Sequence, residues 1–289
     1  MVRPFAQTSL ANLTARGPRV AQASTTNSPS TDMDLAKESG YLWAAARRQP
    51  APLLATPEWM LPSPGARGPV RYLLDTTPGG RVDAFRLSYT SSGTPTWQLT
   101  AGGLRTDSAT VAADWHRLTL SSRSAGEPFL TSKQGTVSFT IGSNGSQLAV
   151  EEGSAPARQH SAVPSAGGSA TGLWYAAVDN AIFGLFITDA STNASRSLLS
   201  GYLLGWSAST GAPSWKRLSA TWSDNGINAQ GVLSACRVAT GTGSEACAAV
   251  ASGVELGIEA GQLAATLSGL PGVSEPLSLQ KATELTPML

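Results

Sequence analysis

Residues 202–215 read Tyr-Leu-Leu-Gly-Trp-Ser-Ala-Ser-Thr-Gly-Ala-Pro-Ser-Trp, and they carry the clearest structural pattern of the chain. Large apolar side chains at every second position from Tyr202 to Trp206 give the period-two pattern of a strand with a buried face. Small polar residues and Gly211 follow, which is the composition of a tight turn that needs a positive φ angle. Pro213 then stands at the start of the next strand, where its missing N–H donor is tolerated. The stretch therefore predicts a β-hairpin.

The same hairpin occurs earlier in the chain, because residues 89–97 read Tyr-Thr-Ser-Ser-Gly-Thr-Pro-Thr-Trp. Gly-Tyr-Leu-Trp-Ala-Ala at 40–45 matches Gly-Leu-Trp-Tyr-Ala-Ala at 172–177. Gln-Leu-Ala occurs further on, at both 147–149 and 262–264. Three matches in one order indicate two copies of one unit, an internal repeat with roughly seven strand-like segments in each copy. The predicted fold class is all-β, with two tandem small antiparallel domains that are either barrels or sandwiches.

These landmarks and the local composition predict the domain organisation. A polar arm (1–39), expected to be flexible, precedes the first β domain (40–152). A linker rich in Ala, Ser, Pro and Gly (153–171) leads to the second β domain (172–269). A short extension (270–289) follows.

The spacing of the landmarks predicts an insertion in the first copy. Trp43 and Trp174 lie 131 positions apart, whereas Trp97 and Trp215 lie 118 positions apart. The first copy would thus carry 13 additional residues (131 minus 118), which we place in the Pro-rich stretch 47–69. Because Pro cannot donate to a central ladder, we expect this stretch to be an excursion on the surface.

Four landmarks of the second copy form a longer pattern: Gly172-Leu-Trp-Tyr-Ala-Ala, Phe183-Gly-Leu-Phe-Ile, a strand that ends at Trp206, and Gly211-Ala-Pro-Ser-Trp215. This pattern resembles a β-repeat of uncharacterised secreted proteins and lipoproteins of proteobacteria, which typically reads Gly-x-Trp-Trp-Asn-Pro, Ser-Gly-Trp-Gly and Gly-x-Pro-Thr-Trp. Ala-Ala stands at the Asn-Pro step in both copies. The resemblance implies an exported β domain and assigns no activity or catalytic residue. The opening Gly-x-Trp is also similar to the first strand of avidin-like and lipocalin-like barrels, which favours a barrel.

The composition argues against several classes of protein. Charged residues make up 13% of the chain, too few for a coiled coil, and 41% hydrophobic residues are too many for a disordered protein. A net charge of +1 provides no attraction to nucleic acid, so we expect no nucleic-acid partner. No run approaches the roughly 18 apolar residues that a transmembrane helix needs.

Cys236 and Cys247 are the two cysteines of the chain. We predict that they form a disulfide across a hairpin, which requires an oxidising compartment; two small buried thiols are the alternative. A lone pair of cysteines does not provide the ligands of a zinc site, and we predict no metal and no cofactor. The composition and the disulfide together favour a secreted, periplasmic or cell-surface location.

No catalytic motif appears in the sequence. Asp114 and His116 would share one face of a strand and could form an acid–base or weak metal pair, but an exposed polar face is the favoured interpretation. No serine stands in the turn that a hydrolase nucleophile needs. We therefore predict no catalytic residues and a protein that is not an enzyme.

The tryptophans supply the candidate ligand-binding residues. Trp115 and Trp222 correspond roughly between the copies and could stack on a sugar ring if they lie in a groove; recurrence in both copies favours a framework role. Trp59, in the Pro-rich stretch, has no apparent counterpart and is the best single contact candidate. Its alternative role is to pack the insertion back onto the domain.

These observations favour an exported binding or adhesion module for a glycan, an apolar ligand or a protein surface. The first alternative is a structural or assembly subunit of an extracellular or envelope structure, with possible self-association. The second alternative is an enzyme of unknown type.

Overall fold

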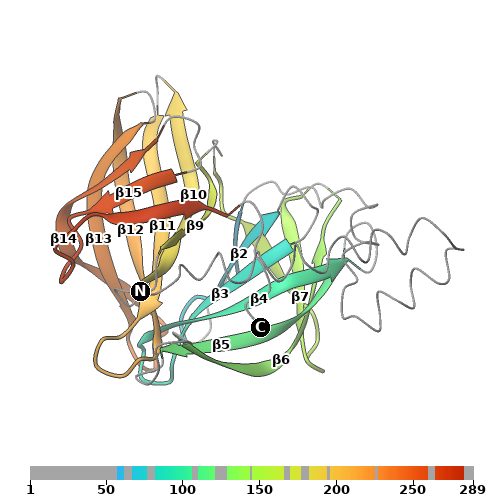
Figure 1. Ribbon diagram of the computed structural model, residues 1–289. Coiled ribbons are helices and arrows are strands. Elements are labelled where there is room, and N and C mark those ends of the chain that lie inside the picture. Colours follow the sequence, from blue (N-terminus) through green and yellow to red (C-terminus); the bar gives the residue numbers. More distant parts are fainter. Residues whose placement is uncertain are drawn as a thin grey trace, which may run out of the picture.

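The computed structural model describes residues 57–61, 67–76, 82–105, 110–120, 129–143, 145–165, 170–176, 182–193, 196–224, 227–259 and 264–282. Every regular element in these residues is a strand, and the strands form two closed antiparallel barrels of eight strands each (Figure 1). The prediction of two tandem all-β units is confirmed, and the choice between barrel and sandwich is settled for the barrel. Within the described residues there is no helix that is long and apolar enough to cross a membrane.

Each barrel follows the chain from strand to neighbouring strand and closes between its first and last strands. The strands of the first barrel are β1 (Glu58–Met60), β2 (Arg71–Thr76), β3 (Val82–Tyr89), β4 (Pro95–Arg105), β5 (Thr110–Leu120), β6 (Phe129–Ile141), β7 (Gln147–Glu152) and β8 (Arg158–Ala162). Those of the second barrel are β9 (Gly172–Ala176), β10 (Ile182–Asn193), β11 (Arg196–Trp206), β12 (Pro213–Asp224), β13 (Asn228–Val238), β14 (Glu245–Ile258), β15 (Ala264–Ser268) and β16 (Leu277–Lys281).

Both predicted hairpins are present, and their turns have the expected chemistry. β4 begins at Pro95 and β12 begins at Pro213, as the sequence predicts. Gly93 and Gly211 adopt φ angles of 75° and 63°, a region that side-chain-bearing residues avoid. The Pro and Gly positions therefore recur in both barrels, although the second turn is one residue longer. The Gly93 N–H donates to the Thr90 carbonyl, whereas the Gly211 N–H donates to the Ser207 carbonyl.

The predicted β domains are too short at two places, because two short strands lie outside them, and a third short strand lies in the predicted insertion. β8 falls in the stretch 153–171 that was expected to be a linker, and β16 falls in the expected extension 270–289. β1 falls in the Pro-rich stretch 47–69. These strands close the barrels, and closure removes the free edges that an open sheet would leave. Residues 40–45 lie outside the described part of the chain.

The register of the strands also corrects the alignment of the two copies. Trp59 in β1 pairs with Tyr72 in β2, and Trp174 in β9 pairs with Leu185 in β10. Trp59 is therefore the structural counterpart of Trp174, at a separation of 115 positions that equals the separation of Gln147 and Gln262. The spacing consequently gives no support to a 13-residue insertion, and Trp59 is part of the repeat.

Tryptophans fill the interiors of both barrels. Trp59 and Trp115 pack in the first barrel with Tyr72 and Phe139, and the rings of Trp115 and Phe139 meet edge to face at 5.7 Å between centroids. The second barrel encloses Trp174 and Trp222 among aliphatic side chains. These interiors are packed cores.

A second core lies between the barrels and is built around Trp97 and Trp215. Trp97 Nε1 donates to the Gly205 carbonyl (2.8 Å), and Trp215 Nε1 donates to the Ser88 carbonyl (3.3 Å). Ser88 and Gly205 occupy equivalent positions, each just before the last residue of the strand that leads into the repeated hairpin. The two bonds are therefore reciprocal, as in the interface of a two-fold dimer.

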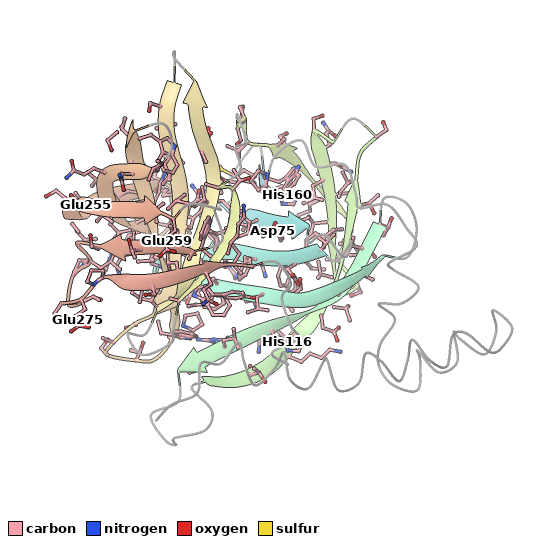
Figure 2. All side chains as sticks on the ribbon, turned by 45° about the horizontal axis from the view of Figure 1, so that its top comes forward. Asp75, His116, His160, Glu255, Glu259 and Glu275 are labelled. Atoms are coloured by element: carbon pink, nitrogen blue, oxygen red, sulfur yellow. A yellow bond between two sulfur atoms is a disulfide. The ribbon has the colours of Figure 1, made fainter. Side chains whose placement is uncertain are left out.

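Aromatic side chains from the outer faces of both barrels complete this inter-barrel core. Trp97 lies 5.1 Å from Phe183 and 5.8 Å from Trp206 between ring centroids. Asp75 extends the contact, since its carboxylate accepts a hydrogen bond from the Leu173 N–H (3.0 Å) on the side of the first barrel that faces the second (Figure 2). The strands in contact are thus buried on both faces.

The predicted disulfide between Cys236 and Cys247 is confirmed. The two residues are direct partners in the ladder between β13 and β14. The disulfide joins the two strands of the β13–β14 hairpin. Val238, which lies between the disulfide and the turn of this hairpin, packs in the inter-barrel core.

Replacing both cysteines with alanine is expected to lower the free energy of unfolding by about 2–3 kcal/mol, because the unfolded chain regains the entropy that the short loop removes. Urea denaturation of the variant and the wild type measures the difference. Thiol titration of the unfolded, unreduced wild type should find no free thiol. Two reactive thiols per chain would contradict the assignment.

Candidate functional site

The two-fold pattern of the inter-barrel core is broken by polar side chains on one side. Glu58 precedes the interior Trp59 as Leu173 precedes the interior Trp174, so Glu58 and Leu173 are equivalent. Leu99 and Arg217 each lie two residues after the matched tryptophan of their strand, Trp97 or Trp215. Leu99 pairs with Phe85 and Arg217 pairs with Tyr202, so these two cross-strand pairs are equivalent.

The diverged residues differ in how they meet the inter-barrel core. Leu173, Phe85 and Leu99 belong to that core, and so does the ring of Tyr202, which lies 5.6 Å from that of Trp215 between centroids. The Tyr202 hydroxyl donates to Glu58 Oε1 at 2.8 Å, and Glu58, Tyr202 and Arg217 all line one cleft. The contact between the barrels is therefore hydrophobic on one side and polar on the other. We place the candidate site on the polar side.

Arg71 is the centre of the polar side. Its guanidinium donates two hydrogen bonds to the Glu245 carboxylate, from Nη1 to Oε1 at 2.8 Å and from Nη2 to Oε2 at 2.6 Å. Its Nε lies 3.6 Å from Glu58 Oε1. The Tyr89 hydroxyl also donates to Glu245. Because Arg71 and Glu58 come from the first barrel and Tyr202 and Glu245 from the second, this network ties the barrels together.

The pKa values of the two carboxyl groups, Glu58 and Glu245, are shifted in opposite directions. Burial raises the pKa of Glu58 above its ordinary value, and the hydrogen bond from Tyr202 and the charge of Arg71 offset only part of that rise. Burial also acts to raise the pKa of Glu245, but the two hydrogen bonds and the charge of Arg71 outweigh it and lower that pKa. Glu245 therefore holds the charge that pairs with Arg71.

A cleft of about 370 Å³ opens beside this network, between β1 and β2 of the first barrel and β10 to β12 of the second. Four of its lining side chains, Glu58, Arg71, Thr188 and Asp189, are polar and buried. Hydroxyl groups form much of the remaining polar wall, contributed by Ser165, Ser200 and Tyr202. A concave site with several buried polar groups is the usual form of a site for a small polar ligand.

A β-bulge in β10 builds one wall of the cleft. Ile187 pairs with Gly201 and Asp189 pairs with Ser200, so Thr188 is the additional residue. Ile187 and Ala190 point into the interior of the second barrel, whereas the two residues between them both line the cleft. In a regular strand one of the two would point inward; the bulge turns both toward the cleft, a common use of bulges near functional sites.

Arg217 stands at the mouth of the cleft. It is exposed, and it makes no hydrogen bond or ion pair with any residue in the described ranges. Arg71, in contrast, is fully engaged by Glu245. Arg217 is therefore the cationic group of the site that remains available for an incoming ligand.

None of the three tryptophans proposed as ligand contacts is accessible in this structure. Trp59 is 0% exposed, Trp115 is 3% exposed and Trp222 is 5% exposed, and each lies in a barrel interior. The expectation of an exposed Trp59 on a surface excursion is wrong, because β1 brings the Pro-rich stretch into the barrel wall. Trp115 and Trp222 also come from non-equivalent strands. Leu99 pairs with the residue after Trp115, and the equivalent Arg217 pairs with the residue after Leu233, so Leu233 is the counterpart of Trp115.

Asp114 and His116 both lie on β5, outside the cleft. Asp114 makes an exposed ion pair with Lys133 at 2.7 Å, and burial lowers the pKa of His116. His160 is buried in β8 (Figure 2). Its ring meets that of Tyr72 edge to face, at 4.8 Å between centroids. Within the described ranges, no group of three or more His, Cys, Asp or Glu residues could hold a metal ion.

Sequence reasoning missed every residue of the cleft. Glu58, Tyr202 and Arg217 come from different copies of the repeat, and no local motif joins them. The difference between the copies at matched positions is the signal that could have found them, once Trp59 is aligned with Trp174. No family model, no curated protein and no solved structure matches this chain.

Proposed function

We propose that this protein is a non-enzymatic binding module that takes a small hydroxyl-rich ligand, such as one or two units of a glycan, in the cleft between its barrels. The observation that carries the proposal is the asymmetry of the inter-barrel contact. Equivalent positions hold Glu58, Tyr202 and Arg217 on the cleft side but Leu173, Phe85 and Leu99 on the other. The apolar side shows that the contact can be made without polar groups. The polar side ties the barrels together through Arg71 and Glu245, and it also presents further polar groups, Asp189 and Arg217, to the cleft; these support a ligand.

The chemistry of the cleft suits a ligand with several hydroxyl groups. Such groups both donate and accept hydrogen bonds, and the walls offer acceptors in Asp189 and Glu58, donors in Arg217, and hydroxyls in Thr188 and Ser200. A purely apolar ligand would leave these buried groups without compensation for lost water. An apolar ligand inside a barrel is also disfavoured, since aromatic side chains occupy the barrel interiors.

An exported location is part of the proposal. The disulfide between Cys236 and Cys247 needs an oxidising compartment to form and persist. The resemblance of the repeat to secreted proteins and lipoproteins of proteobacteria supports the same location. Membership of that family is likewise a proposal.

Arg217→Ala is expected to weaken glycan binding about ten- to hundredfold, because it removes the free charged donor at the mouth of the cleft. The wild type is first screened on an array of mono- and oligosaccharides, and titration calorimetry then compares variants with the retained sugar. Arg117→Ala is the matched control, since Arg117 is also exposed on a strand but lies outside the cleft. Retention of no sugar, or equal affinity of Arg217→Ala and wild type, would count against the proposal.

A glycoside hydrolase is the second candidate, favoured by one observation. Glu58 and Asp189 are buried carboxyl groups on the same cleft, and the raised pKa of Glu58 is a property of general acids. The hydrogen bond from Tyr202 and the contact with Arg71 give Glu58 a structural role instead, which is why binding is preferred. New reducing ends released from the retained sugar, and lost with Glu58→Gln, would favour the enzyme.

A further inference from the structure

Polar side chains lie at one end of the first barrel where leucines lie at the same end of the second. The interior tryptophans Trp59 and Trp174 are equivalent, so their strand neighbours give the other matches. Two matches lie on the second and third strands of each barrel, and two lie on the last strand, counted back from the residue that pairs with the tryptophan. The matched residues are Tyr72 and Leu185, Arg86 and Leu203, Arg158 and Leu277, and His160 and Leu279. The four leucines belong to the core of the second barrel, which shows that the framework forms without polar groups at these positions.

The polar residues of the first barrel form one connected layer. The Tyr72 hydroxyl donates to Glu152 Oε1 at 3.1 Å, and Arg86 Nε lies 3.4 Å from the same oxygen. Arg86 Nη1 also donates to Gln98 Oε1 at 3.2 Å. Burial raises the pKa of the Tyr72 hydroxyl, and the charge of Glu152 adds to that rise. The charges of Arg86 and Arg158 act against it, so both guanidinium groups lie near this layer.

The chain connections beside this end also differ between the barrels. Residues 269–276 connect β15 to β16, and Leu270 among them is buried in the core of the second barrel. The matching connection between β7 and β8 has only residues 153–157, and all five are exposed. The side chains of Arg86 and Glu152 keep 28% and 31% of their surface exposed, whereas their apolar surroundings are buried. Solvent therefore reaches the polar layer of the first barrel.

The layer holds donors that no acceptor of the described residues uses. Arg86 is paired with Glu152, but Arg158 is exposed, and its guanidinium makes no hydrogen bond or ion pair within the described ranges. Trp115 lies 6.2 Å from Tyr72 between ring centroids and is 3% exposed. Its Nε1 has no hydrogen-bond acceptor in the described part of the chain, although buried N–H groups usually have one. One uncompensated cation and one unused buried donor in the same layer are the groups that an oxyanion needs.

We propose that this end of the first barrel binds the carboxylate or phosphate group of a small molecule, with Arg158 and Arg86 as its cationic partners. A guanidinium can donate two parallel hydrogen bonds to either group, which makes arginine well suited to both. A cationic ligand would be repelled by the two guanidinium groups, since the one carboxylate of the layer, Glu152, is already engaged by Tyr72 and Arg86. None of these residues lines the cleft between the barrels, so the site is separate from the one proposed for a glycan.

Titration of the full, nitrogen-15-labelled chain with sodium acetate or inorganic phosphate tests the proposal, with sodium chloride holding the ionic strength constant. We expect at least one of the two anions to shift the indole N–H resonance of Trp115 saturably, and Trp115→Phe assigns that resonance. Arg158→Leu copies the second barrel and should raise the dissociation constant about tenfold, because it removes a charged donor. Arg237→Leu, which removes an exposed arginine of the second barrel, is the matched control and should change nothing. Circular dichroism verifies that both variants fold.

Two results would overturn the proposal. The first is a Trp115 resonance that neither anion shifts saturably, which would leave the polar layer as a purely structural network. The second is an equal dissociation constant for Arg158→Leu and the wild type, which would place the anion elsewhere. Saturation by acetate alone or by phosphate alone supports the proposal and identifies the group that is bound. None of these results bears on glycan binding in the cleft, which Arg217→Ala tests separately.

Discussion

Trp97→Ala is expected to lower the free energy of unfolding by about 3–5 kcal/mol, the usual cost of removing a fully buried tryptophan. The substitution empties the centre of the inter-barrel core, where Trp97 packs against Phe183 and Trp206. It also leaves the Gly205 carbonyl without its buried donor. Because the contact is reciprocal, we expect Trp215→Ala to have an effect of similar size.

Urea denaturation followed by circular dichroism measures this loss. The wild type should unfold in one transition, whereas Trp97→Ala should separate the unfolding of the two barrels. Trp97→Phe is the matched control: it keeps most of the apolar area and loses the hydrogen bond, so its cost should be about 1–3 kcal/mol. A loss below about 1 kcal/mol for Trp97→Ala would mean that the inter-barrel core does not hold the barrels together.

Arg71→Met is expected to lower the free energy of unfolding by about 3–5 kcal/mol at neutral pH, because it leaves the buried Glu58 and the partly buried Glu245 without their cation. Methionine fills much of the same volume, so the loss reports the charge more than a cavity. Glu245 is the more affected group, since it loses both hydrogen bonds from the guanidinium.

The loss should shrink as the pH falls, and the direction follows from the two carboxyl groups. In the wild type the lowered pKa of Glu245 contributes stability that is present above its unfolded pKa and is lost as the pH falls through the folded pKa. The raised pKa of Glu58 acts oppositely: the folded state holds its proton more tightly, so stability rises as the pH falls through the folded pKa. Without Arg71, the pKa values of both Glu58 and Glu245 should be raised in the folded state, so the stability of the variant should rise as the pH falls.

Urea denaturation of wild type and Arg71→Met at neutral and mildly acidic pH tests this account. The double variant Arg71→Met, Glu58→Gln is the control, since a neutral amide at position 58 can still accept the Tyr202 hydrogen bond. It should recover part of the lost stability at neutral pH and less at acidic pH. A gap between wild type and Arg71→Met that widens on acidification would contradict the proposed charge pairing.

The sequence predicts the parts of the fold that rest on local chemistry. Gly211 adopts a positive φ angle and Pro213 begins a strand, and both roles are typical of these residue types. The repeated hairpin can therefore be predicted from the sequence. The disulfide is predictable for a similar reason, because two cysteines at hairpin spacing have few other uses. Antiparallel barrels then follow from two copies of a strand-rich unit.

The sequence does not predict the shortest strands. β1 has three residues in a Pro-rich context, and β8 has five residues of polar character, so neither carries a period-two pattern of useful length. Closure of the barrel selects them, and closure is a property of the whole sheet. The misalignment of Trp43 with Trp174 followed from the same gap, because β1 was not recognised as a strand.

The candidate site is beyond the reach of local patterns for a different reason. The alternation of apolar side chains in β3 and β11 distinguishes the two faces of each strand. It does not say which face points into the barrel, because the outer face is also buried where it contacts the other barrel. Trp97 therefore has the sequence pattern of an interior residue although it lies between the barrels. Glu58 and Tyr202 are 144 positions apart, and only the packing of the barrels brings them together.

Amide hydrogen exchange with and without the retained sugar shows whether the polar side of the inter-barrel contact is a ligand site. We expect slower exchange on binding in the segments that line the cleft, 58–60, 163–165, 188–189 and 198–202, with no change around Phe85 and Leu173 on the apolar side. Protection confined to the apolar side or to the barrel interiors, or no protection anywhere, would contradict it.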